Sequence, residues 1–244
     1  MSEMDVIRQI AERTMMISVP AGSNHAWLWD RTLRILRNVE TICQMTELTS
    51  KDFPIDRFCL TAAACFAETG FSRCESREKK AAPLVLSDIN LAELRDYSAQ
   101  AAAVGLGTIL AKPKVEKCCK IILESANRFT EMVEAAILSD ARNLDDMGVV
   151  GLCHEFRRAA IQGRGVSDIL DSWKRKIDYR YWQARLREGF HFESVRQLAE
   201  KRFNTAAWFM NRLADEHHNI PDAEPSETNV SYPHQPELTT VHPK

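Results

Sequence analysis

The sequence predicts an all-α fold, and three observations support this prediction. Apolar residues recur at steps of three and four along most of the chain, which is the period of amphipathic helices. No segment shows the sustained two-residue alternation that is typical of strands. The Asn-Gly and Asp-Gly pairs that close tight hairpins are absent. We therefore expect one bundle of about eight to ten helices over residues 1–219.

The first helices are defined by their caps and apolar stripes. Ser23 is a good N-cap for a helix whose inward face reads Leu28, Thr32, Ile35, Val39 and Ile42. A second helix should run from Ile55 to Glu68, after Pro54. Gly70 would close it, because glycine suits a left-handed C-terminal position.

The middle of the chain alternates between helices and breaks. Residues 72–83 are polar and charged, and we expect an exposed loop there. An Ala-rich helix should span Asn90–Val104, ended by Gly105 and Gly107. Pro113 is well placed to begin a helix that continues through Leu123, because proline is favoured in a first helical turn.

The later helices carry the longest apolar pattern. Thr130 opens one helix, and two more are expected around 146–161 and 166–188. One face of a long last helix reads Phe192, Val195, Leu198, Ala199, Arg202, Phe203, Ala206, Phe209, Met210 and Leu213. Residues 220–244 are rich in proline and poor in large apolar side chains, so they are predicted to be a disordered tail.

Composition narrows the class of protein. The chain has 244 residues, is 45% hydrophobic and 27% charged, and has a formal net charge of −2. This charge argues against broad nucleic-acid binding, although a local basic patch is compatible with it. No apolar run approaches the roughly 20 residues of a membrane helix, and the N-terminus lacks the features of a secretion signal. Seven cysteines without a CxxC pair suggest reduced, mostly buried thiols, so we expect a cytoplasmic protein.

Three blocks of sequence give the chain a family resemblance. They are LWDRTLRIL at 28–36, AACFAETG at 63–70 and ILSDARNLDDMGVVG at 137–151. On these blocks the chain resembles the HD-domain phosphohydrolases, all-α enzymes that use a metal to hydrolyse phosphoester bonds, often in nucleotides. The closing segment LAEKRFNTAAWFMNRLADE resembles a bacterial branch of the same family.

The resemblance also shows where this chain departs from the family. The family's first histidine falls on Arg31, and its His-Asp dyad falls on Ala67 and Glu68. The late metal-binding aspartate falls on Asp140, which is retained. A guanidinium and a methyl group cannot act as metal ligands, so these vestigial metal-site positions imply that the metal site is lost.

A charge argument suggests what replaced the metal. If the fold is kept, Arg31, Glu68 and Asp140 converge, and two unpaired buried carboxylates would be costly. A guanidinium is permanently charged and can bind carboxylates in a forked geometry. We therefore hypothesise a structural Arg31–Glu68–Asp140 cluster; the alternative is that Arg31 points to solvent.

Four further residues are candidates for ligand binding. Arg34 frames the same site and would suit an anion. His25 could complete a reduced metal site or could be a helix cap, and His154 could face a cavity or be a partly buried helical histidine. Asp145 is either a helix-end acid or part of the site.

An aromatic and cationic stretch, KIDYRYWQARLREG, has two readings. Tyr179, Tyr181 and Trp182 could stack on a base beside a phosphate, or they could form the amphipathic face of a helix.

Three functions remain open from the sequence. The leading one is a pseudoenzyme that keeps the scaffold, has no cofactor and binds a nucleotide, another phosphorylated small molecule or a protein partner. The second is an active phosphohydrolase with an altered site, which would need a divalent metal. The third is a structural partner-binding protein, for which a homo-oligomer would be support.

Overall fold

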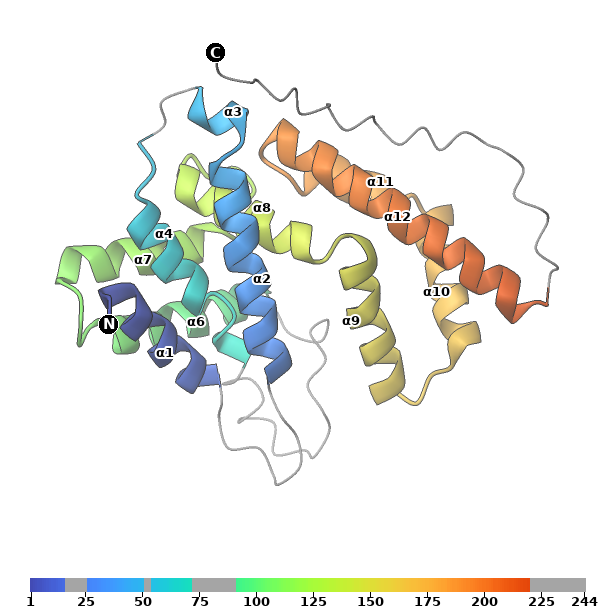
Figure 1. Cartoon of the computed structure of the whole chain (residues 1–244), viewed down its shortest axis with the longest axis horizontal. Helices are drawn as coiled ribbons and strands as arrows, with labels where there is room; N and C mark the ends of the chain where they lie inside the picture. The colour runs from blue at the N-terminus through green and yellow to red at the C-terminus, as the bar shows by residue number, and fades with distance from the viewer. Residues whose placement is uncertain (16–25, 51–53, 72–90, 220–244) are drawn as a thin grey trace, which may run out of the picture.

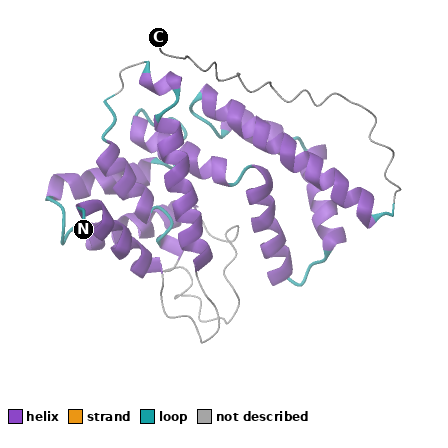
Figure 2. Ribbon diagram, in the orientation of Figure 1, coloured by secondary structure: helices purple, strands orange, loops and turns teal. Residues whose placement is uncertain are grey.

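The computed structural model describes residues 1–15, 26–50, 54–71 and 91–219, and the regular structure in these ranges is helical (Figures 1 and 2). The described helices are α1 (Glu3–Met15), α2 (Ala26–Cys43), α3 (Thr46–Thr49), α4 (Arg57–Phe66), α6 (Leu91–Leu106), α7 (Lys112–Glu124), α8 (Val133–Asp145), α9 (Gly148–Ile161), α10 (Val166–Asp178), α11 (Tyr181–Glu188) and α12 (Glu193–His217). The all-α prediction is confirmed. Among the described helices, none is both long and apolar enough to cross a membrane.

Some predictions concern residues outside these ranges. They are the N-cap at Ser23, the role of His25, the loop at 72–83 and the tail at 220–244.

The helices form two groups that meet along α8 and α9 (Figure 1). In the first group, α1, α2, α4, α6, α7 and α8 enclose the main core, which includes the fully buried Ile35, Leu60, Phe66, Ile121 and Ile137. In the second group, α12 packs along α9 and contacts α10 and α11, around Leu152, Ala206 and Met210. The apolar stripes that predicted the helices are therefore the faces that the fold buries.

Gly70 has a different role from the one predicted. The helix α4 ends at Phe66, and Gly70 is not among the residues with a left-handed backbone. A β-carbon on Gly70 would lie 2.4 Å from the carbonyl oxygen of Leu94 and 2.8 Å from Ser98 Oγ. Gly70 is needed because α6 passes too close for a side chain. The left-handed backbone of a helix cap, which the sequence suggested, is not the reason.

The predicted helix over 166–188 is two helices. Arg180 separates α10 from α11 and has a φ of 53°, which is in the left-handed region. This conformation costs about 1 kcal/mol or more for a residue with a side chain, so the tertiary structure must favour the bend. The bend directs Arg185 toward Asp146 at the end of α8.

The described cysteines are free thiols. Four of them, Cys43, Cys59, Cys65 and Cys118, are buried, as the sequence suggested. Burial raises the pKa of Cys65 to about 12, so this thiol stays protonated and inert. Cys153 is exposed and is an exception to the expected burial.

Candidate functional site

The side chain of Arg31 lies at the centre of a buried ion-pair cluster. It projects from α2 and is 4% exposed. Its Nε atom donates to Glu68 Oε2 at 2.9 Å. Its Nη1 atom donates to Asp145 Oδ2 at 2.8 Å and to Asp146 Oδ1 at 2.7 Å. The predicted pairing of Arg31 with Glu68 is present, and the alternative that Arg31 points to solvent is wrong.

Three more arginines complete this cluster. Arg34 Nε donates to Asp145 Oδ1 at 2.7 Å, and Arg185 Nη2 donates to Asp146 Oδ2 at 2.9 Å. Arg142 Nε lies 2.6 Å from Glu68 Oε1. The ion-pair cluster is thus Arg31, Arg34, Glu68, Arg142, Asp145, Asp146 and Arg185. Each of its carboxylates contacts two guanidiniums.

The charges in the cluster hold one another ionised. Burial disfavours the charged form of Arg31, but its carboxylate partners, Asp146 foremost, raise the pKa of the guanidinium. Burial would likewise raise the pKa of Asp146, but Arg31 and Arg185 lower it to about 2. These opposite charges therefore favour the charged forms of Arg31 and Asp146 despite their burial.

Asp140 is not part of the cluster, so the third member of the predicted triad is wrong. Its oxygens accept hydrogen bonds from the main-chain N–H of His191 at 2.9 and 3.1 Å and of Phe192 at 3.1 Å. Its Oδ1 also lies 2.8 Å from His191 Nδ1. Asp140 is fully buried and anchors the start of α12.

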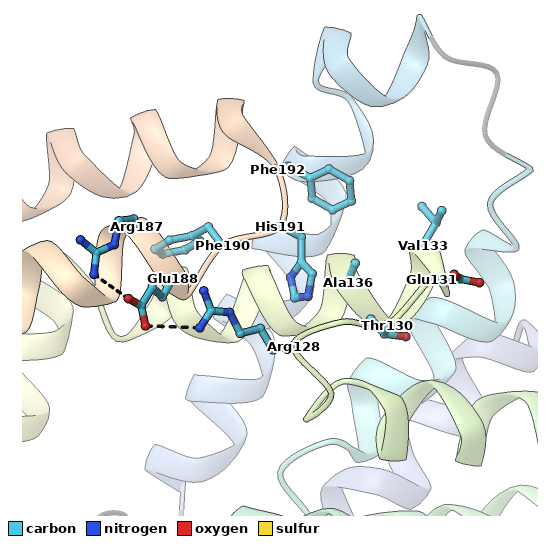
Figure 3. A pocket seen from close by; sticks show the side chains of 10 residues that line it. All are labelled: Arg128, Thr130, Glu131, Val133, Ala136, Arg187, Glu188, Phe190, His191 and Phe192. Carbon is cyan, nitrogen blue, oxygen red and sulfur yellow. Dashed lines mark hydrogen bonds and ion pairs between the residues drawn. The ribbon is translucent and has the colours of Figure 1, made fainter.

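The bonds to Asp140 leave His191 beside a separate hollow of about 400 Å³ (Figure 3). Figure 3 shows the imidazole between Arg128 and Phe192, while Glu188 pairs with Arg128 and Arg187. The hydrogen bond to Asp140 raises the pKa of His191 above its ordinary value. The ring of His191 is thus an imidazolium over a wider pH range than the ring of a free histidine. In this form it stabilises the junction between α11 and α12 through Asp140.

A larger pocket lies against the ion-pair cluster and has a volume of about 660 Å³. The helices α2, α6 and α8 line one side, and α9, α10 and α11 line the other. Besides Arg31, its cations are Arg95, Arg142, Arg157, Arg158, Lys176 and Arg185, and its carboxylates are Asp146 and Glu155. Its aromatic side chains are Trp27, Phe71, Tyr181 and Trp182. We call it the basic pocket.

Several buried N–H groups of the basic pocket have no hydrogen-bond partner. They are Nε and Nη1 of Arg95, Nη1 of Arg142, and Nε1 of Trp182. Nε of Arg142 is occupied by its ion pair with Glu68 Oε1 at 2.6 Å, so it is not counted among these donors. Arg95 is 7% exposed and Arg142 is 6% exposed. Buried donors without acceptors are costly, so their concentration in one pocket points to an acceptor-rich ligand.

The structure separates the remaining predicted site residues. Ala67 is fully buried at the end of α4, next to Glu68. His154 lines the basic pocket, and its Nε2 accepts from Arg34 Nη2 at 3.2 Å because a guanidinium can only donate. Arg34 and Asp145 line a different hollow of about 430 Å³. His25 lies outside the described residues.

Sequence reasoning gave no site role to Arg95, Arg142 or Arg185. Arg95 follows the buried Leu94 and precedes the buried Ser98 by three residues, and Arg142 follows Leu138 by four. A basic residue at the helical spacing of a buried face was the available signal. The aromatic stretch was also informative, since Tyr181 and Trp182 line the basic pocket, whereas Tyr179 is 82% exposed and is not among the lining residues.

Metal ligands are not grouped in the part of the chain that the structure describes. Within it, no three side chains of His, Cys, Asp and Glu lie together as a metal ion would require. The carboxylates nearest the basic pocket contact guanidiniums instead.

Comparison with known proteins yields matches to solved structures alone. No protein-family model matches the sequence, and the search of curated proteins finds no match. The crystal structure of Bacillus subtilis YpgQ in its selenomethionine form is 16% identical, with a TM-score of 0.56, over 90% of this chain and 95% of that one. YpgQ in complex with ADP is 17% identical, with a TM-score of 0.55, over 90% and 96%. The Lin1889 protein from Listeria innocua is 16% identical, with a TM-score of 0.56, over 89% and 98%. At these identities the likeness shows that the chain shares the helical fold of these proteins.

Proposed function

We propose that this protein binds a nucleotide or another phosphorylated small molecule in the basic pocket, on an HD-domain-like scaffold that does not carry out the family's metal-dependent hydrolysis. One observation carries the proposal: two buried arginines, Arg95 and Arg142, present unpartnered N–H groups to a pocket of about 660 Å³. Phosphate oxygens are the acceptors that guanidiniums bind best in this environment.

The size and lining of the pocket agree with such a ligand. Its volume falls within the range of about 300–1,000 Å³ that is typical of small-molecule sites. Tyr181 offers an aromatic ring on which a base can stack, whereas the guanidinium of Arg157 already lies over the ring of Trp27, 4.2 Å from its centroid. YpgQ, which shares the fold, has been crystallised in complex with ADP, which adds support for a nucleotide.

The loss of hydrolysis follows from the state of the carboxylates. A metal that activates water needs open carboxylate or imidazole ligands. Glu68 contacts Arg31 and Arg142, and Asp140 is saturated by the main chain and ring of His191 and by Phe192. Neither residue is available as the ligand that the family would use.

Arg95 provides a sharp test of binding. Among the described residues it makes no hydrogen bond or ion pair, so Arg95→Met removes a buried charge without breaking such an interaction with them. We expect the variant to be at least as stable as the wild type and to bind ADP at least about tenfold more weakly, because one charge-assisted interaction of about 1.5–3 kcal/mol is lost. Isothermal titration calorimetry with ADP, together with thermal unfolding, measures both quantities.

The control is Arg128→Met, which removes an exposed arginine outside the basic pocket. ADP affinity should be unchanged in this variant. The proposal fails if Arg95→Met lowers stability and leaves ADP affinity intact, because Arg95 would then be structural. It also fails if the wild type releases phosphate from nucleotides in a reaction that requires added Mn²⁺.

A further inference from the structure

We infer that the basic pocket takes the metal-free form of a nucleoside di- or triphosphate, with guanidiniums in place of the Mg²⁺ that usually accompanies such ligands. This inference rests on the proposed function and specifies its ligand. Arg95 and Arg142 come from different helices, α6 and α8, and both present unpartnered N–H groups: Nε and Nη1 in Arg95 and Nη1 in Arg142.

The number of free donors favours two adjacent phosphates over one. A guanidinium binds a phosphate best through two parallel N–H groups. Arg95 and Arg142 can each donate to a different phosphate group, and Trp182 Nε1 adds a further buried donor in the same pocket. A monophosphate would leave some of these donors unsatisfied, at a cost of about 1–3 kcal/mol for each such group.

The carboxylates in and behind the pocket are not available to a cation. Mg²⁺ at nucleotide sites is held by one or two carboxylates together with phosphate oxygens. Asp146 contacts Arg31 and Arg185, and Glu68 contacts Arg31 and Arg142.

The other lining carboxylate, Glu155, contacts Arg158 and Lys176. A magnesium ion would have to break two ion pairs to gain any one of these ligands. The ion would also place two positive charges beside buried guanidiniums, and repulsion between like charges disfavours this.

The experiment compares ADP, AMP and inorganic pyrophosphate by calorimetry, each with EDTA and each with excess Mg²⁺. We expect ADP to bind in EDTA at least about tenfold more tightly than AMP, because it makes at least one more charge-assisted contact. Excess Mg²⁺ should weaken ADP binding, because the ion neutralises the phosphate charge that the arginines recognise. In Arg95→Met the difference between ADP and AMP should shrink, whereas in Arg128→Met it should persist.

The outcomes separate this inference from the proposed function. Binding of ADP that requires Mg²⁺, or equal affinities for AMP and ADP, overturns the inference and leaves phosphate-ligand binding in place. If ADP, AMP and pyrophosphate do not bind under either condition, the proposed function fails and the inference fails with it.

Discussion

Arg31 shows how one side chain can stabilise an arrangement of buried acids. Three carboxylates, from the turn after α4, from α8 and from the turn after α8, lie within 2.9 Å of its guanidinium. A cation with several directional donors allows these acids to stay ionised in the protein interior. Glu68, the lone acid at the end of an Ala-rich helix, is thus part of a salt-bridge cluster.

The first prediction concerns this residue. Arg31→Met keeps the length of the side chain and removes the charge, which leaves Glu68, Asp145 and Asp146 with fewer partners. We expect the free energy of unfolding to fall by about 3–5 kcal/mol, because breaking a buried pair leaves an uncompensated charge. Urea denaturation measures the loss.

The matched control is Arg37→Met, an exposed arginine on the same helix. Its effect should stay within about 0.5 kcal/mol, as for most surface substitutions. If both variants lose the same small amount, the carboxylates do not depend on Arg31.

At the scale of the element, α8 serves two sites with opposite faces. Successive residues of a helix are rotated by about 100°, so Asp140 and Arg142 point in nearly opposite directions. Asp140 reaches the junction that precedes α12, whereas Arg142 faces Glu68 and the basic pocket. This rotation is the physical reason why Asp140 and Arg31 do not meet.

The junction before α12 should make stability depend on pH through His191. The pKa of His191 is raised in the folded protein. At pH values between the unfolded and the folded pKa, the folded state therefore binds more protons than the unfolded state. The stabilisation should be fully present below the unfolded value of about 6.5 and lost as pH rises through the folded pKa. Comparing unfolding free energies of the wild type and His191→Gln across this range measures it.

The difference between the two proteins should shrink as the pH rises. Gln197→Ala, at an exposed position of α12 without a titratable side chain, is the control and should show no such trend. A constant difference between wild type and His191→Gln at all pH values would contradict the Asp140–His191 ion pair.

At the scale of the whole molecule, Asp146 links the two groups of helices. It pairs with Arg31 of α2 on one side and with Arg185 of α11 on the other. The left-handed residue Arg180 makes this link possible because it turns α11 away from the direction of α10. The basic pocket lies between the same helices, so the link also fixes the shape of this pocket.

Removing this charge should loosen the second group. In Asp146→Asn we expect faster amide hydrogen exchange in α10 and α11, with little change in α4 and α7.

Because the pKa of Asp146 is lowered to about 2, its stabilisation should be present above the ordinary aspartate value of about 3.9 and lost as pH falls toward 2. Glu188→Gln, an exposed carboxylate on α11, should leave exchange unchanged; equal exchange in Asp146→Asn and the wild type would contradict a linking role.

The sequence by itself determined the helices, because the period of apolar residues directly records which face each helix buries. The family resemblance of the blocks at 28–36 and 63–70 placed Arg31 near Glu68, and the cost of an unpaired buried acid then predicted their pairing. The sequence could not show that Gly70 serves the close approach of α6, because that approach involves residues far along the chain.

The tertiary structure alone decided which acids join Arg31 and where the basic pocket lies. The sequence does not distinguish Asp140, Asp145 and Asp146 from one another. Asp145 and Asp146 reach the cluster because they lie at the end of α8, whereas the rotation along α8 directs Asp140 to another side. The basic pocket draws on side chains from six helices, so its unpartnered donors come together only when those helices pack. Long-range packing decides such a site, and local sequence patterns do not encode it.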